Sequence, residues 1–158
     1  MANNIYSADS TTDKIYKHDG FSNTILDSFS SPSTAPVGLA WDGVNLYSSD
    51  DSTDKIYRHV NFTSAIETSF SMGAMTIGDL SCDLNNLFCI RGSGTASVLK
   101  LQGISSTILD SFSSPDINPR GLSWDGTNIY STDISDSPSK IYKHSGFSAS
   151  ILDSFSSP

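Results

Sequence analysis

The chain has 158 residues, a formal net charge of −8, 37% hydrophobic residues and 16% charged residues. This length fits one domain, and the composition excludes both a membrane protein and a charge-driven disordered segment. The negative charge argues against nucleic acid as a partner. No apolar run approaches the ~18 residues that span a bilayer, and residues 1–4 lack the basic and apolar segments of a signal peptide. The sequence therefore predicts a soluble chain without a membrane partner and leaves its compartment unassigned.

The acidic residues disfavour helices. Glu67 is the one glutamate, so almost all of the acid is aspartate. Aspartate, serine, threonine and asparagine compete with the helix backbone for hydrogen bonds and prefer turns and strand ends. We therefore expect an all-β chain.

An internal repeat of about 42 residues runs through the whole chain. Aromatic residues recur at this period at Tyr6, Tyr47, Phe88 and Tyr130. Repeats of this length are typical of β-propellers, in which each unit forms one blade. We divide the single domain 1–158 into a partial unit and three further units, at residues 1–37, 38–78, 79–120 and 121–158.

Each unit contains four short runs with the character of strands. In chain order, the second unit has them at 38–41, 46–50, 55–59 and 66–70. Asp42-Gly43 joins the first two runs and is a strong predictor of a hairpin, because glycine tolerates the positive φ of such turns. A β-solenoid also repeats, but its coils are shorter and lack these hairpins. The prediction is an all-β propeller with about four blades of four antiparallel strands.

The repeat predicts 15 strands, with one inner strand missing. Asn3-Asn4-Ile5 aligns with Val44-Asn45-Leu46, so the first unit begins at the turn before its second strand. An arc of blades that does not close exposes two apolar faces. Such an arc can curl into a tight four-bladed ring, join a second copy into about eight blades, or grow into filaments. We expect a homo-oligomer that associates through the open blade faces.

Residues 38–59 carry a recognisable motif. They contain Gly-Leu-Ala-Trp-Asp-Gly, then Asn-Leu-Tyr-Ser-Ser-Asp, then Lys-Ile-Tyr-Arg-His. This unit resembles the blades of the YWTD and NHL-like β-propeller superfamily. Arg91 replaces the repeated aspartate in the third unit, and Ser48 and Ser131 stand where the YWTD motif has tryptophan. The resemblance implies a propeller fold, and the superfamily hosts binding modules, lactone hydrolases and interaction platforms, so it implies no single function.

One face of the predicted disc carries the candidate ligand-binding residues. The ends of second strands and the starts of first strands meet there, and the resemblance implies that this is the face that most often binds ligands. Arg91 and Arg120 are the only basic residues outside the third strands, and an arginine suits a carboxylate, a sugar or a peptide. The candidate set is Asp9, Asp50, Asp79, Arg91, Arg120 and Asp133. For the strand-end aspartates the favoured interpretation is structural, namely that each side chain caps the following loop.

Two further groups of residues invite a metal hypothesis, and we predict no metal site or cofactor. His18, His59 and His144 recur at one position of successive blades, too far apart to share an ion. Calcium binding by Asp50, Asp51 and Asp54, or by Asp133 with Asp136, lacks the spacing of a known calcium loop. Cys82 and Cys89 are expected to be free thiols, because a diagonal pair barely meets disulfide geometry.

Catalysis has little support in the sequence. We find no nucleophile elbow, phosphate loop or paired glutamates. We therefore expect a non-enzymatic propeller module that self-assembles and serves as a structural or binding platform. The alternative is a lectin-like propeller that binds a small molecule or glycan in one pocket per blade, and a metal-dependent hydrolase comes third.

Overall fold

The structure is a computed structural model that describes residues 4–92, 96–135 and 137–157. The described residues form 15 strands in four antiparallel sheets, as the repeat predicts. No helix in these ranges has the length and apolar character needed to cross a membrane.

The sheets are four blades that follow one another along the chain. The first blade contains β1 (Ile5–Asp9), β2 (Lys14–His18) and β3 (Ile25–Ser30). The second blade contains β4 (Pro36–Trp41), β5 (Leu46–Asp50), β6 (Lys55–His59) and β7 (Ile66–Ser71). The third blade contains β8 (Ile77–Cys82), β9 (Asn86–Arg91), β10 (Ser97–Gln102) and β11 (Ile108–Ser113). The fourth blade contains β12 (Pro119–Trp124), β13 (Ile129–Asp133), β14 (Lys140–His144) and β15 (Ile151–Ser156).

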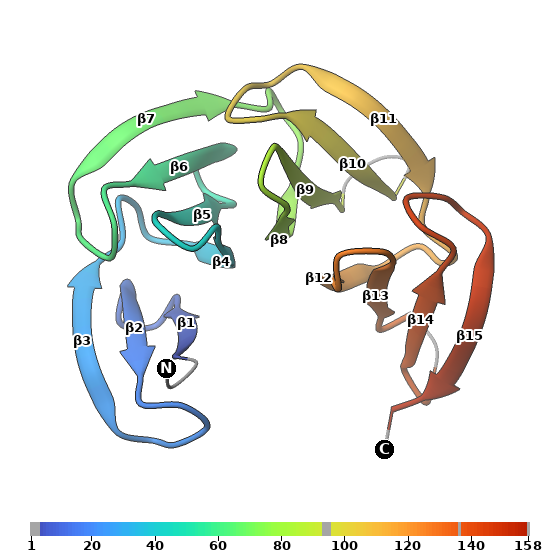
Figure 1. The fold of residues 1–158 in the computed structure, drawn as a ribbon, viewed down its shortest axis with the longest axis horizontal. Helices are drawn as coiled ribbons and strands as arrows, with labels where there is room; N and C mark the ends of the chain where they lie inside the picture. The colour runs from blue at the N-terminus through green and yellow to red at the C-terminus, as the bar shows by residue number, and fades with distance from the viewer. Residues whose placement is uncertain (1–3, 93–95, 136, 158) are drawn as a thin grey trace.

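The four blades form an arc of a β-propeller (Figure 1). The inner strands β4, β8 and β12 lie toward the centre, and the outer strands β3, β7, β11 and β15 form the rim. Along the inside, β1 contacts β4, β4 contacts β8, and β8 contacts β12. The first and fourth blades stand at the two ends of the arc, separated by the opening at the bottom of Figure 1.

The Asp-Gly hairpins form as predicted. Asp42 Oδ1 accepts the amides of Val44 and Asn45 at 2.8 and 2.7 Å, and Gly43 takes a φ of 97°. Asp125 makes the same two bonds in the fourth blade, to Thr127 and Asn128. In each case the carboxylate accepts hydrogen bonds from the turn amides. These bonds stabilise the turn that connects the first and second strands of a blade.

The hydrophobic core lies between the blades, because each blade in the middle of the arc packs against a neighbouring blade on both of its faces. Ile56 and Leu80 belong to one cluster between the second and third blades. Phe88, Val98 and Ile129 belong to another cluster between the third and fourth blades. Blade-to-blade packing, rather than a single central core, therefore stabilises the fold.

Two histidines are fully buried where neighbouring blades meet, and their rings lie 5.0 Å (His59) and 4.9 Å (His144) from Phe29 and Phe112 of the preceding blade. His59 Nδ1 lies 3.0 Å from the Thr63 carbonyl, so it must donate there, and Nε2 accepts from the Ser48 hydroxyl at 2.8 Å. His144 repeats the pair with Ser131, at 2.9 Å. The neutral ring satisfies both partners, and burial lowers the pKa of both histidines below its usual value of 6.5.

This burial predicts a loss of stability in mild acid. The unfolded histidines take up protons at a higher pH than the folded ones. The free energy of unfolding should therefore have its full value above pH 6.5 and decrease as the pH is lowered below 6.5. The slope for each histidine has an upper limit of about 1.4 kcal/mol per pH unit, which applies where only the unfolded form is protonated. Urea unfolding at pH 7, 6 and 5 measures this slope. The double variant His59→Gln, His144→Gln should flatten the profile in this range, and parallel profiles for the two proteins would contradict the assignment.

Candidate functional site

The three strand-end aspartates cap the loops that follow them. Asp9 Oδ1 accepts the amide of Thr11 at 2.7 Å, and this bond holds its pKa below the usual value. Asp50 accepts the amides of Ala35 and Thr53 at 3.1 and 3.0 Å. Burial raises the pKa of Asp50, but its hydrogen bonds outweigh that effect and the pKa is lowered.

Asp133 makes the same kind of cap, with the amides of Asn118 and Ser135 at 3.0 and 2.7 Å. Its side chain and that of Asp50 are buried. Loop capping, the favoured interpretation, therefore accounts for the recurrence of these aspartates. Asp136, the other half of the second calcium hypothesis, lies outside the described residues.

Asp79 links two neighbouring blades. Its Oδ1 accepts the amide of Leu80, and its Oδ2 accepts the amide of Leu122 on the next inner strand, both at 2.9 Å. Burial raises the pKa of this carboxyl group, although the amides oppose the effect. Arg91 is half-buried at the end of β9, and Arg120 is exposed near the start of β12.

The strand registers place the six predicted ligand-binding residues toward one face of the propeller. Ile77 pairs with Arg91, and Pro119 pairs with Asp133, so first-strand starts and second-strand ends share a face. The cavities described below take their walls from other residues. The role of the six residues in ligand binding stays a prediction.

Aromatic rings join the first blade to the second. Tyr6 stacks on Trp41 with 5.3 Å between ring centroids and lies 5.4 Å from Phe62. Phe29 meets the Phe62 ring edge to face at 4.9 Å. The Lys17 ammonium sits 5.9 Å from the centre of the same ring. Phe62 is thus held in a socket of two rings and one cation.

The third and fourth blades repeat this contact at equivalent positions. Phe88 lies 5.3 Å from Trp124 and 5.6 Å from Phe147, and Phe112 meets Phe147 edge to face at 5.0 Å. Lys100 lies 6.0 Å from the centre of the Phe147 ring. The same loop phenylalanine therefore enters the same socket at two separate seams.

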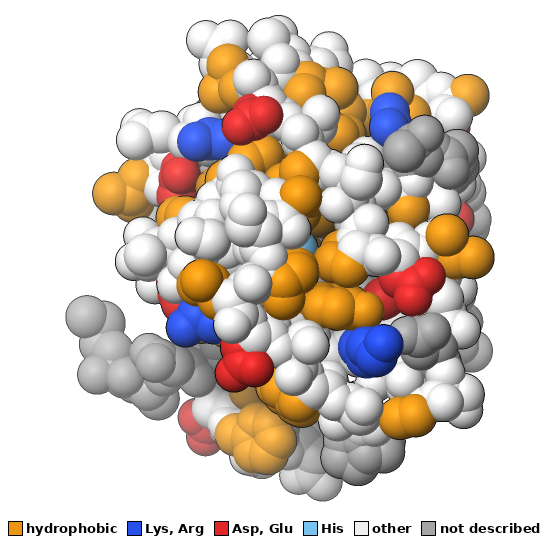
Figure 2. All heavy atoms as spheres, turned by 90° about the vertical axis from the view of Figure 1, so that its right-hand side faces the viewer, with side chains coloured by type: hydrophobic (Ala, Val, Ile, Leu, Met, Phe, Trp, Pro, Cys, Tyr) orange, Lys and Arg blue, Asp and Glu red, His pale blue; other side chains and the backbone are white. Residues whose placement is uncertain are grey.

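Both halves of this contact recur, uncovered, at the ends of the arc. Phe21, the loop phenylalanine of the first blade, is 100% exposed. The socket residues of the fourth blade are Tyr130, Lys143 and Phe155, and Phe155 is 61% exposed. They line a hollow of about 210 Å³, and Figure 2 shows hydrophobic side chains among polar ones on the side of the arc where β15 lies.

The seam between the second and third blades is different. Cys82 occupies the position of the two tryptophans, and Ile104 that of the loop phenylalanine. A cavity of about 210 Å³ lies between them and Tyr47. Both cysteines are free thiols, as expected, and burial raises the pKa of Cys82 to about 11 and that of Cys89 to about 12.

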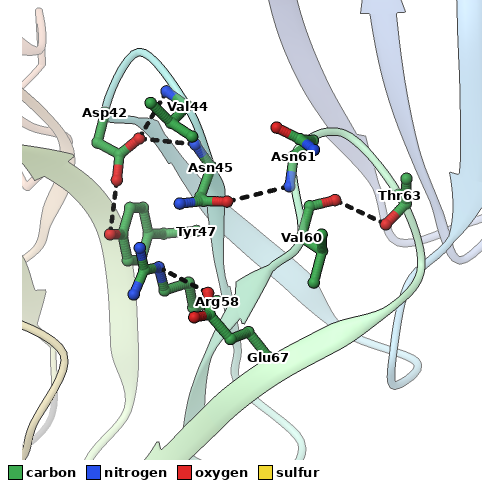
Figure 3. A network of polar contacts seen from close by, with 9 residues as sticks. All are labelled: Asp42, Val44, Asn45, Tyr47, Arg58, Val60, Asn61, Thr63 and Glu67. Carbon is green, nitrogen blue, oxygen red and sulfur yellow. Dashed lines mark hydrogen bonds and ion pairs between the residues drawn. The ribbon is translucent and has the colours of Figure 1, made fainter.

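A polar network borders this seam (Figure 3). The Tyr47 hydroxyl donates to Asp42 at 2.8 Å, and Arg58 Nε pairs with Glu67 at 3.2 Å. Burial, followed by the bond to Asp42, raises the pKa of Tyr47 above its usual value. Burial raises the pKa of Asp42, but the amides of its turn, the tyrosine and Arg58 outweigh it, so this carboxylate is ionised at neutral pH. Sequence reasoning missed this site, although the substitution of Cys82 for tryptophan in the repeat pointed to it.

An open cavity of about 470 Å³ lies at the face of the Asp-Gly hairpins. Its lining includes Trp41, Cys82, Leu84, Trp124 and Gly126. This is the opposite face from the predicted ligand-binding set.

No protein-family model matches the chain, and no curated protein matches it. Solved structures do. Over 98% of this chain, glutaminyl cyclase from Myxococcus xanthus is similar with a TM-score of 0.79 and 12% identity, across 67% of its own length. The computationally designed Ika8 protein matches with a TM-score of 0.64 and 14% identity, over 98% of this chain. BamB from Moraxella catarrhalis matches with a TM-score of 0.58 and 10% identity, over 99% of this chain. The chain spans 46% of each of the latter two proteins, and what it shares with these proteins is the β-propeller fold.

Proposed function

We propose that this chain is a non-enzymatic β-propeller module that assembles with further copies of itself into a structural or binding platform. The observation that carries the proposal is the pair of complementary end faces. Phe21 at one end and the hollow lined by Tyr130, Lys143 and Phe155 at the other repeat a contact that two internal seams already make. We also propose that its blades belong to the YWTD and NHL-like group.

The proposed contact is head to tail. Phe21 of one copy enters the hollow of the next copy, just as Phe62 enters its socket on the first blade. The two faces differ, so the contact is heterologous, and it forms a ring where the rotation closes. Two copies supply eight blades, which lies within the usual range for propellers.

The mass in solution tests the proposal. Light scattering over a range of concentrations should give about twice the 16.9 kDa of one chain. Phe21→Ser should return the mass to that of a monomer, because it removes the ring that enters the hollow. Leu84→Ser is the matched control, since Leu84 is 90% exposed but lies in a hairpin away from both end faces. A strict monomer at all concentrations would sink the proposal.

A second candidate is a lectin-like binding role. The cavity walled by Trp41 and Trp124 favours it, because exposed parts of tryptophan rings offer flat apolar surface to a sugar. A glycan array tests this role. Binding that the variant Trp124→Ala abolishes would support it, and an array without any binding would remove it.

A further inference from the structure

We infer that the cavity between the second and third blades is a binding site for a small, neutral, planar aromatic ring that carries an N–H donor. This site is separate from the end faces, so the inference does not depend on self-assembly. It rests on a comparison of three seams within one chain.

The first step is the loss of two rings at one seam. At the other two seams, the second-strand aromatic residue contacts a tryptophan and a loop phenylalanine at 5.3–5.6 Å. At the middle seam, the equivalent residue is Tyr47, and Cys82 and Ile104 stand in place of these partners. At this seam the second blade therefore has the aromatic ring of the repeat, whereas the third blade lacks both the tryptophan and the loop phenylalanine.

The second step is that the blades have not closed over the gap. The cavity holds about 210 Å³, is partly open to solvent, and has Tyr47, Cys82, Leu87 and Ile104 as its apolar wall; polar residues line the rest of it, namely Asp42, Arg58, Asp83, Asn85 and Asn86. An apolar cavity of about 150 Å³ binds benzene in an engineered protein, so this volume admits a bicyclic ring. The ligand would occupy space that tryptophan and phenylalanine side chains fill elsewhere in the molecule.

The third step is the charge at the rim. Asp42 and Asp83 both line the cavity, and the pKa of each carboxyl group is lowered, because its hydrogen bonds outweigh the opposing effect of burial. Arg58 is the one cation among the lining residues; its Nε forms an ion pair with Glu67 at 3.2 Å, and its charge also lowers the pKa of Asp42, so three carboxylates surround one guanidinium. Two carboxylates favour a ligand that donates a hydrogen bond and disfavour an anion.

Asp42 has the capacity to accept such a bond. Its Oδ1 receives two turn amides, whereas among the residues that the structure describes its Oδ2 receives only the Tyr47 hydroxyl, at 2.8 Å. A carboxylate oxygen accepts two hydrogen bonds, so Oδ2, which Figure 3 shows directed at the Tyr47 hydroxyl, has the capacity for one more. An indole-like N–H meets both requirements, because it stacks on Tyr47 and donates to an acceptor at its edge.

Titration with indole, followed by two-dimensional amide NMR, tests the inference. We expect saturable shifts of the Tyr47, Leu87 and Gly103 amides with a dissociation constant on the order of 0.1–1 mM. Amides of β15 serve as an internal reference that should not move. Indole-3-acetate should bind at least about tenfold more weakly, since its carboxylate meets two like charges.

Variants that restore the repeat provide the decisive comparison. Cys82→Trp places the missing ring in the cavity and should abolish the shifts, and Ile104→Phe should weaken binding about tenfold or more. Ile117→Trp is the matched control, because it adds the same ring at an exposed position and should leave binding unchanged. The amide spectrum without ligand shows whether each variant folds.

The outcomes separate the possible sources of the ring. Tighter binding of N-acetyltryptophanamide than of indole would identify the ring as a tryptophan side chain of a peptide, and the reverse order identifies a free small molecule. Shifts that do not saturate, or equal binding by Cys82→Trp and the unaltered chain, would overturn the inference. A monomeric mass in light scattering would leave it untouched.

Discussion

Replacing Phe88 by alanine is expected to reduce the free energy of unfolding by about 3–5 kcal/mol. Phe88 is 1% exposed and contacts the rings of Trp124 and Phe147 across the seam between the third and fourth blades. Truncation removes both ring contacts and leaves a cavity that the rigid inner strands cannot close. Urea unfolding followed by tryptophan fluorescence measures the loss, because Trp124 reports on this seam directly.

Phe155→Ala is the matched control for this prediction. Phe155 is a phenylalanine of the fourth blade that faces the open end of the arc and is 61% exposed, whereas Phe88 of the third blade is buried. In the background of Phe21→Ser, which keeps the chain monomeric, its truncation should change stability by no more than about 0.5 kcal/mol. Comparable losses for the two variants would show that stability does not come from the blade seams.

The strands and turns of this fold follow from local sequence. Asp42-Gly43 and Asp125-Gly126 predict hairpins because an aspartate can cap its own turn and glycine accepts a positive φ, and both hairpins form. The first strand of a blade starts slightly before the sequence motif that predicts it. β4 begins at Pro36, two residues before Gly38, because the chain already pairs with the end of β5 there.

Contacts between blades are less accessible to sequence reasoning. The sequence shows Cys82 in the register of Trp41, but whether the neighbouring blades close over the smaller side chain depends on the rigidity of two sheets. The Asp79 carboxylate shows the same limit, since its partner amide on Leu122 lies 43 residues away in sequence. The predicted ligand face was inferred from resemblance, whereas the described cavities depend on packing that only three-dimensional structure reveals.

The last prediction concerns the close approach of β4 to β8 at Gly38. Gly38→Ala is expected to cost about 3 kcal/mol, at the upper end of the usual range for overpacking. A Cβ atom on Gly38 would lie 2.6 Å from Asp79 Cα and 2.7 Å from both Gly78 O and Leu80 N. These are backbone atoms of β8, so β4 and β8 must separate. Separation would also break the bridge in which Ser49 accepts the Gly38 amide and donates to the Gly78 carbonyl, both at 2.8 Å.

Gly121, the equivalent glycine of the fourth blade, is the control that identifies the cause of this loss of stability. A Cβ on Gly121 would meet Thr132 Oγ1 at 2.8 Å, and that atom belongs to a side chain that can rotate. Gly121→Ala should therefore cost only about 1 kcal/mol, the value of the hydrogen bond from the Gly121 amide to Thr132. Urea unfolding of the two variants compares them directly. Equal losses would mean that contact with the β8 backbone costs no more than displacing the Thr132 hydroxyl, whereas a larger loss at Gly38 shows that contact between β4 and β8 sets the width of the middle seam, and with it the size of the cavity beside Tyr47.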